Sequence, residues 1–369
     1  MPAPTTTTSL TGPFPDSRAT ESPPALRSAA KTTYGIVSIQ VLADMHSDLL
    51  FEVAFWRTEP NPFGNRWLGN LTEGDVGLQV CAVGADLDGP VEGILRTVLL
   101  QIAACHRAVQ DNAERVALVR AGSDLNGNRV GLLLALEGAE PLGADPDLVD
   151  AFWALGVRMV SLTWNRRNLL GDGVGERSPG GLSDAGVRVV ERLAAIGMVI
   201  DLAHAAGPTF SDILRHAPEA PIVVSHGACR AVHESPRNLS DAQLREVAAC
   251  GGVLGVMGHP LAIDPARPTV DRLVDHVLHA AGVMGIEHVG LGGDFMHQIA
   301  NSGALQTPLA ADAVVPVGFA RDATIEGLRG PQDYRRLVEG LERRGVAGAD
   351  LASILSGNVL RFLAGSLPH

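Results

Sequence analysis

The segment VLADMHSDLL at residues 41–50 places ionisable side chains in an otherwise apolar, strand-like stretch. Asp44, His46 and Asp48 occupy every second position. Successive side chains of a strand point to opposite faces, so these three are expected to share one face. That face could be the solvated side of a surface strand. It could also point into a metalloenzyme site, because imidazole and carboxylate groups are common ligands of catalytic metals.

Four more apolar runs end in ionisable residues, always at the same end of the run. These residues are Glu137, His204, His226 and Asp294. Any one of them alone could be a satisfied polar core residue or a strand-end cap. The coincidence of five such runs instead favours a single site, built where parallel strands end.

The residue types match a two-metal hydrolytic site, in which each zinc ion keeps one position open for water. If Glu137 bridges the ions, the two ligand sets are His46, Asp48 and Glu137 for one ion, and Glu137, His204 and His226 for the other. The ions would share a bridging hydroxide and polarise a carbonyl oxygen. Asp44 would lie a layer deeper, where a carboxylate could orient a ligand.

Eight short apolar runs could position these residues. They begin near residues 41, 77, 130, 157, 197, 221, 251 and 288. Because the runs are almost continuously apolar, they indicate parallel strands buried on both faces. Helix-like segments lie between them, at 91–121, 182–197 and 239–250 among others, and two more helices are expected within 331–345 and 349–365. The order predicts an α/β fold, a (β/α)8 TIM barrel. A doubly wound sheet is the alternative, but it usually has a Gly-rich turn after its first strand, and none occurs here.

Composition excludes several classes of function. The formal charge of −12 argues against nucleic acid or an anionic membrane surface as a partner. The only lysine is Lys31, which excludes a Walker-type phosphate loop and disfavours Schiff-base chemistry. Four cysteines without CxxC spacing fit reduced thiols and a cytoplasmic protein. Residues 1–33 are rich in Thr, Pro and Ser and lack the apolar stretch of a secretory signal, so we expect a disordered tail before a barrel domain at 34–369.

Five motifs, DMHSD, LEGAEPL, DLAH, SHGACRAVHESPRNLSD and GLGGDF, occur in this order. Together they resemble the membrane (renal) dipeptidase family, over roughly residues 34 to 366. The resemblance implies a barrel of the metal-dependent hydrolase type, two Zn²⁺ per subunit and a homodimer. It also implies a small peptide substrate: zinc-dependent cleavage of dipeptides, tolerant of a D-residue at the C-terminal position, and sometimes β-lactam hydrolysis.

The resemblance also implies roles for single residues. The family's metal ligands fall on His46, Asp48, Glu137, His204 and His226. Arg237 falls on the arginine that holds the substrate's C-terminal carboxylate, and Asp294 on the aspartate that handles the substrate amine and shuttles a proton. Trp164 stands where animal members carry a histidine that contacts the scissile carbonyl. Since indole donates a hydrogen bond but cannot take up a proton, stabilisation of the oxyanion would rest on zinc, on Trp164 or on Asn165.

Three hypotheses therefore remain open. The first is a zinc dipeptidase. The second is a binuclear zinc hydrolase of another amide, lactam or lactone, for example one that tailors a peptide-derived metabolite, and Trp164 motivates it. The third is a catalytically silent barrel that serves in binding or assembly, against which the complete ligand set argues.

Other residues near the site are harder to assign. Met296 and His297 could reshape the pocket or only begin a long loop over 296–330. His233 and His259 lie close enough in sequence to barrel loops that they could belong to the site. The histidines in helical segments, which include His276, are expected to be structural or solvent-facing.

Overall fold

The structure is a computed structural model that describes residue 1 and residues 41–84, 91–126, 128–305 and 314–369. The disordered tail expected at 1–33 lies, apart from Met1, outside the described residues, so that expectation stays a prediction. No helix in the described ranges is both long and apolar enough to span a bilayer.

Eight parallel strands form a closed ring. They are β1 (Leu42–Ser47), β2 (Val76–Gly84), β4 (Val130–Glu137), β5 (Val157–Ser161), β6 (Val199–Asp201), β7 (Ile222–Gly227), β8 (Val253–Met257) and β9 (Val289–Gly292). Each strand pairs with its neighbours in this order, and the ring closes because β1 pairs with both β2 and β9. The predicted barrel is therefore confirmed, and the doubly wound alternative is wrong, because an open sheet would leave two edges.

One predicted element is wrong in part. The helix expected over 91–121 ends at Asp111, and a short strand, β3 (Val116–Leu118), follows it. Asn112 ends the helix: its backbone carbonyl accepts from the N–H groups of Arg115 and Val116, and its amide exchanges hydrogen bonds with that of Asn61 at 3.0 and 2.8 Å. The β-branched start of β3 then pairs with the beginning of β4, outside the ring.

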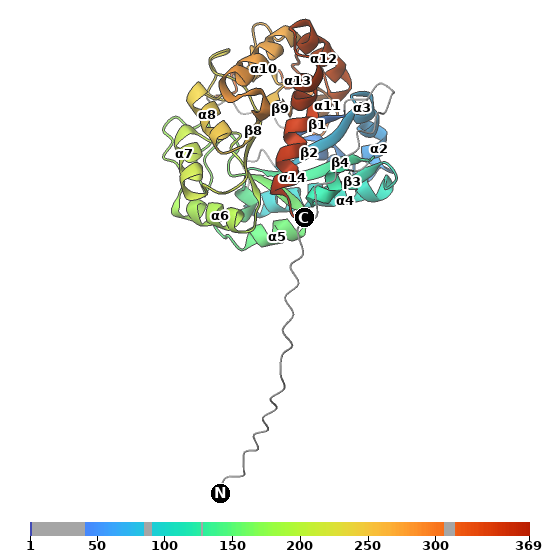
Figure 1. Cartoon of the computed structure of the whole chain (residues 1–369). Coiled ribbons are helices and arrows are strands. Elements are labelled where there is room, and N and C mark those ends of the chain that lie inside the picture. Colours follow the sequence, from blue (N-terminus) through green and yellow to red (C-terminus); the bar gives the residue numbers. More distant parts are fainter. Residues whose placement is uncertain (2–40, 85–90, 127, 306–313) are drawn as a thin grey trace, which may run out of the picture. The chain divides into compact units, whose positions relative to one another are not determined.

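Helices lie around and against the ring (Figure 1). They are α1 (Leu49–Phe55), α2 (Pro62–Arg66), α3 (Leu68–Glu73), α4 (Val91–Asp111), α5 (Leu148–Ala154), α6 (Asp184–Ala195), α7 (Gly207–His216), α8 (Asp241–Ala249), α9 (Pro260–Ile263), α10 (Val270–Met284), α11 (His297–Asn301), α12 (Tyr334–Arg343), α13 (Gly348–Ala352) and α14 (Asn358–Ser366). A π-helical turn, Ser353–Gly357, joins α13 to α14. Two of the expected helices are capped by serine: the hydroxyl groups of Ser183 and Ser240 accept from backbone N–H groups in the first turns of α6 and α8.

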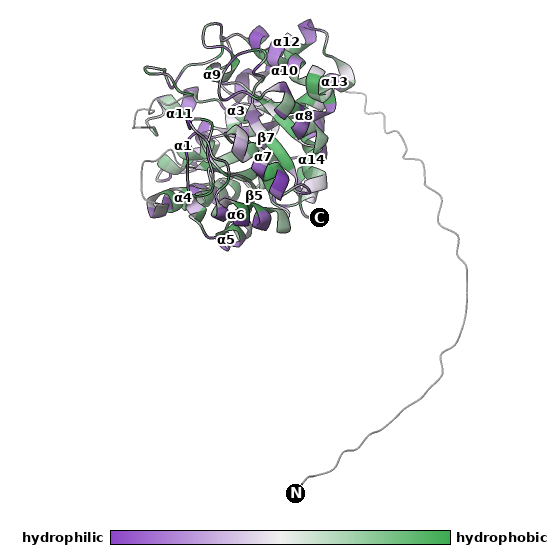
Figure 2. Ribbon diagram, turned by 90° about the vertical axis from the view of Figure 1, so that its left-hand side faces the viewer, coloured by the Kyte–Doolittle hydropathy of each residue, from purple (hydrophilic) through white to green (hydrophobic). Residues whose placement is uncertain are grey.

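Two apolar cores hold the fold together. The larger lies between the ring and its helices, and the smaller fills the inside of the ring. The strand β7 is mainly apolar in Figure 2, whereas the outer helix α12 carries many polar residues. Val359, Leu363 and Leu367, in and just after α14, pack onto the inner core beside Met45 and Leu133. The helix α14 therefore completes the core of the barrel itself.

We expect Leu363→Ala to lower the free energy of unfolding by about 2–5 kcal/mol, because it leaves a cavity in the inner core. Urea denaturation would measure it. The matched control is Leu99→Ala on α4, where the side chain is 41% exposed and the expected change is within about 0.5 kcal/mol. Equal effects of the two substitutions would contradict the closing role of α14.

Candidate metal centre

The ionisable residues singled out in the sequence meet at the carboxyl ends of the strands. Glu137 is the last residue of β4, and His226 lies within β7. His46 lies in β1, and Asp48 follows the end of that strand. His204 and Asp294 stand in the turns after β6 and β9.

Three of these side chains form a tight triangle. The Nε2 atoms of His204 and His226 are 2.9 Å apart, and they lie 3.2 and 3.4 Å from Oε1 of Glu137. Ligand atoms that surround one zinc ion tetrahedrally at ordinary bond lengths are about 3.3 Å apart. The three residues therefore fit the coordination of a single metal ion.

A second, wider group lies on the other side of Glu137. His46 Nε2 is 3.7 Å from Asp48 Oδ2, 3.7 Å from Glu137 Oε2 and 4.0 Å from Asp294 Oδ1. This Nε2 atom is buried and has no hydrogen-bond partner among the described residues. Buried nitrogen atoms normally have a hydrogen-bond partner. A nitrogen that has none and is surrounded by carboxylates fits the binding of a second cation. The two oxygens of Glu137 thus face different groups, as a bridging ligand requires.

The charges at this centre also favour a cation. Burial raises the pKa of Glu137 well above its ordinary value, although the nearby His46 opposes this shift. Burial, followed by the charge of Asp48, raises the pKa of Asp294 to about 7. Burial works against the charged form of His46, yet the negative charges of Glu137 and Asp48 raise its pKa to about 10. In the protein without metal, a proton on His46 would therefore supply positive charge that the carboxylates need.

His204 and His226 behave in the opposite way. Burial, together with the positive charges of His46 and Arg237, lowers the pKa of both imidazoles well below the ordinary value. They are therefore neutral, which is the form that binds metal. Nδ1 of His204 bonds Oδ1 of Asn165 at 2.7 Å, and Nδ1 of His226 bonds the hydroxyl of Ser225 at 2.8 Å. Because an amide oxygen only accepts, Nδ1 of His204 carries the proton and Nε2 keeps its lone pair for the centre.

The backbone is irregular where it carries the site residues. The pairing register shifts between Asp44 and Ser47 on β1 and between Val224 and Gly227 on β7. His46 and His226 lie inside these two stretches, and such irregularities redirect a side chain from the face that strict alternation gives it. Four non-glycine residues in the described ranges have positive φ, and two of them are His204 (64°) and Asp294 (50°). Residues held in this region commonly mark functional sites.

Asp44 does not contact the imidazole ring of His46 by a hydrogen bond. Its Oδ1 atom accepts from the backbone N–H of His46 at 3.1 Å and from that of Gly293 at 2.7 Å. The fully buried carboxylate therefore joins the end of β1 to the turn that carries Asp294. The expectation that Asp44 lies a layer deeper and orients a ligand stays a prediction. If Asp44 does orient His46, it acts through the backbone N–H of that residue.

A cavity of about 120 Å³ opens onto this centre. Arg237 lines it and donates from Nη2 to the carbonyl of His226 at 2.7 Å. Trp164 lines it too, with its ring centroid 5.8 Å from that of His204. The other apolar lining residues include Met257, Leu261, Met296, Val315 and Phe319.

Two open questions from the sequence have answers here. Met296 faces the cavity, whereas His297 begins α11 and lines a different pocket. His259 also belongs to the cavity, and burial lowers its pKa to about 4. The sequence left His259 open because closeness to a barrel loop does not decide whether its side chain enters the site.

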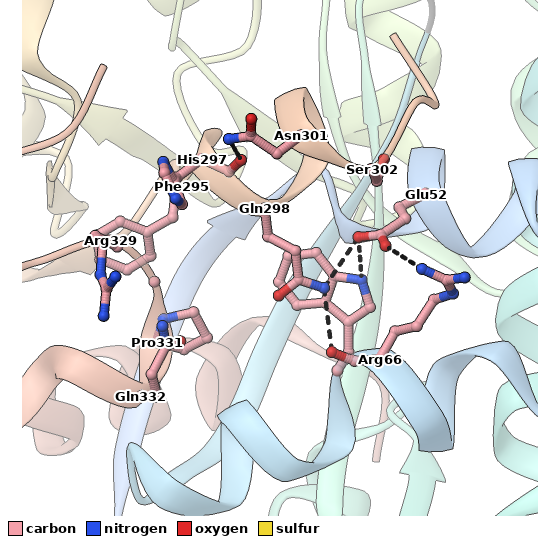
Figure 3. Close-up of a pocket in the computed structure, with 12 residues that line it drawn as sticks. Glu52, Arg66, Phe295, His297, Gln298, Asn301, Ser302, Arg329, Pro331 and Gln332 are labelled. Carbon is pink, nitrogen blue, oxygen red and sulfur yellow. Dashed lines mark hydrogen bonds and ion pairs between the residues drawn. The ribbon is translucent and has the colours of Figure 1, made fainter. Parts of the chain in front are cut away.

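A larger pocket, of about 540 Å³, is lined by residues of and next to α11, among them His297 and Gln298 (Figure 3). Its central carboxylate, Glu52, is already bound: it accepts from Arg66 at 3.1 Å, from Trp67 at 3.1 Å and from Gln298 at 3.0 Å. These bonds tie α1 and the α2–α3 junction to α11. The network therefore fixes the helix that follows Met296, and it leaves Glu52 no role as a ligand.

Comparison with known proteins fits this architecture. Residues 34–306 match the membrane dipeptidase family, peptidase family M19, and the chain belongs to that family. Dipeptidase verJ from Clonostachys rogersoniana is 30% identical over 275 residues, which are 73% of this chain and 65% of that protein. An uncharacterised dipeptidase of Schizosaccharomyces pombe is 32% identical over 239 residues, which are 63% of this chain and 53% of that protein. The matched regions thus span about half to two thirds of these two relatives.

Solved structures agree on the fold. A metallo peptidase from Rhodobacter sphaeroides, liganded with a phosphinate mimic of the dipeptide L-Ala-D-Ala, superposes with a TM-score of 0.74 at 21% identity. The superposition covers 88% of this chain and 99% of that one. A structure described as dipeptidase AC, of the same M19 family, gives 0.73 at 22% identity and covers 89% and 99% of the two chains.

One helical histidine outside the centre supports the site loops. His276 on α10 is fully buried; its Nδ1 accepts from the N–H of Cys229 at 3.0 Å, and its Nε2 bonds the carbonyl of Ile263 at 2.9 Å. It thus joins α9 and the loop after β7 to α10. Burial lowers the pKa of His276 to about 4.

We therefore expect the protein to lose stability as the pH falls from about 6.5 to about 4. In that range the unfolded chain binds a proton on this residue and the folded protein does not, so His276 contributes up to about 3 kcal/mol of the loss. Urea denaturation at several pH values would measure this. His276→Gln should flatten the dependence, whereas the control His216→Gln, at an exposed position on α7, should not. The same pH dependence in both variants would contradict the assignment.

Proposed function

We propose that this protein is a dipeptidase that uses two zinc ions, with His46, Asp48, Glu137, His204 and His226 as ligands. The observation that carries the proposal is the position of Glu137, whose two oxygens face the two nitrogen-bearing groups at 3.2–3.7 Å. Membership of the membrane dipeptidase family supports the same reaction class. Zinc held there would supply a water of lowered pKa and polarise the scissile carbonyl.

The protein's own groups would bind and orient the dipeptide. Arg237 is buried and lines the cavity, so its guanidinium could hold the free C-terminal carboxylate through paired hydrogen bonds. Asp294 lines the cavity, 4.0 Å from Nε2 of His46, so its carboxylate could bind the substrate amine and exchange a proton with it. The small, largely apolar cavity favours a short substrate. Tolerance of a D-residue, a homodimer and a cytoplasmic location stay predictions.

The second candidate is a two-zinc hydrolase of another amide, lactam or lactone. Trp164 favours it, because its indole lines the cavity beside His204, where a titratable group would aid peptide cleavage. Asn165 cannot take up a proton either; its oxygen accepts from His204, which leaves only its NH₂ group to donate a hydrogen bond in the cavity.

The first test is hydrolysis of L-Ala-D-Ala and L-Ala-L-Ala by zinc-loaded protein, with and without EDTA. We expect cleavage that EDTA abolishes and zinc restores, because both proposed positions need the metal. The ratio of the two rates measures the tolerance for a D-residue. If the protein binds two zinc ions but cleaves neither dipeptide, the result would contradict the dipeptidase and favour the second candidate, a hydrolase of another amide, lactam or lactone.

Arg237→Ala should raise KM for dipeptides by about 10- to 100-fold, because it removes a pair of charge-assisted hydrogen bonds to the substrate carboxylate. The change in kcat should be smaller. Zinc content, measured in parallel, should stay near that of the unaltered protein. Arg215→Ala, an arginine on α7 whose side chain is 64% exposed, is the control and should leave KM unchanged. An unchanged KM in Arg237→Ala would rule out the carboxylate-binding role.

A further inference from the structure

The buried carboxylate of Asp201 reaches both histidines of the tight triangle. It ends β6, three residues before His204, and its side chain lies beside β7, which carries His226. Asp201 is only 5% exposed. Neither the ligand set nor the substrate-binding groups explain why a carboxylate is buried at this position.

One oxygen of Asp201 organises the backbone. Oδ1 accepts from the N–H of Ala203 at 3.0 Å and from the N–H of Ser225 at 2.8 Å. The first bond shapes the turn that takes His204 into its left-handed conformation. The second holds Ser225, the residue directly before His226. One oxygen therefore fixes the backbone on both sides of the triangle.

The other oxygen acts on the ring of His226 through a hydroxyl group. Ser225 Oγ donates its only proton to Oδ2 of Asp201, so towards His226 it can only accept. Nδ1 of His226, 2.8 Å away, must then carry a proton and donate it. The neutral ring is left with its lone pair on Nε2, the atom that faces Glu137 and His204.

We propose that Asp201 is a positioning residue for the metal ion bound by His204 and His226: it sets the tautomer of His226 through Ser225 and holds the turn before His204. The inference rests on the proposed two-zinc function. An asparagine at 201 would reverse the relay, because its NH₂ group would donate to Ser225 Oγ and turn the hydroxyl proton towards Nδ1 of His226. The ring proton would then move to Nε2, where it obstructs the metal.

The test compares Asp201→Asn with Asp264→Asn. Asp264 is a buried aspartate that also closes a turn, by accepting from the N–H of Ala266 at 3.1 Å, but it pairs with Arg272 instead of a site residue. Zinc titration of each metal-free protein against a chromophoric chelator gives the affinity of each ion. Nitrogen-15 NMR of the metal-free protein, with His226 assigned by substitution, gives the tautomer of that ring without any metal.

We expect Asp201→Asn to lower the affinity for one zinc ion by about 10- to 100-fold. It should also move the ring proton of His226 from Nδ1 to Nε2. Asp264→Asn should change neither. Ser225→Ala keeps the carboxylate of Asp201 and removes only the hydroxyl group. It should lower the affinity for the same zinc ion and leave the His226 ring as a mixture of the two tautomers.

An Nδ1–H tautomer and two unchanged zinc affinities in Asp201→Asn and Ser225→Ala would overturn the inference. Failure of the unaltered protein to bind two zinc ions would instead overturn the proposed function. In that case the NMR result still reports separately on the relay from Asp201 to His226.

Discussion

The centre depends on one carboxylate, that of Glu137, which lies between two groups of nitrogen and oxygen atoms and has only 11% of its side chain exposed. Burying this charge beside Asp48 and Asp294 is costly unless positive charge is close. Arg237 and a protonated His46 supply some of that charge in the protein alone. Metal ions at both oxygens would supply more, so the geometry and the electrostatics of the site lead to the same requirement.

Around Glu137 the protein fixes the proposed ligands through the backbone. Asp44 joins the end of β1 to the turn before Asp294, and Asp201 joins the turn before His204 to Ser225. In each case a buried aspartate on one strand ties down a neighbouring strand end. Such bonds restrict where the neighbouring side chains can lie, and metal binding and catalysis both need side chains that are held in place.

Much of this arrangement follows from local sequence patterns. Apolar runs ending in polar residues gave eight strands and their direction, and the barrel then places Glu137 and His226 at one rim. The strand β3 was missed because Val116–Leu118 continues the helical periodicity of α4, and only pairing with β4 decides otherwise. Asn165, Ser225 and Asp201 were missed as positioning groups because their partners are distant in sequence or depend on register shifts. Tertiary contacts alone reveal them.

The position of α14 has a consequence for how the chain acquires its fold. Val359, Leu363 and Leu367 complete the core inside the ring, but they follow β9 by more than 60 residues. During synthesis every strand of the ring leaves the ribosome before the segment that closes the ring's interior. Until then we expect a nascent barrel to expose apolar surface, such as that of Met45 and Leu133, of the kind that chaperones bind. Folding of the site is thereby delayed until residues far from it have been made.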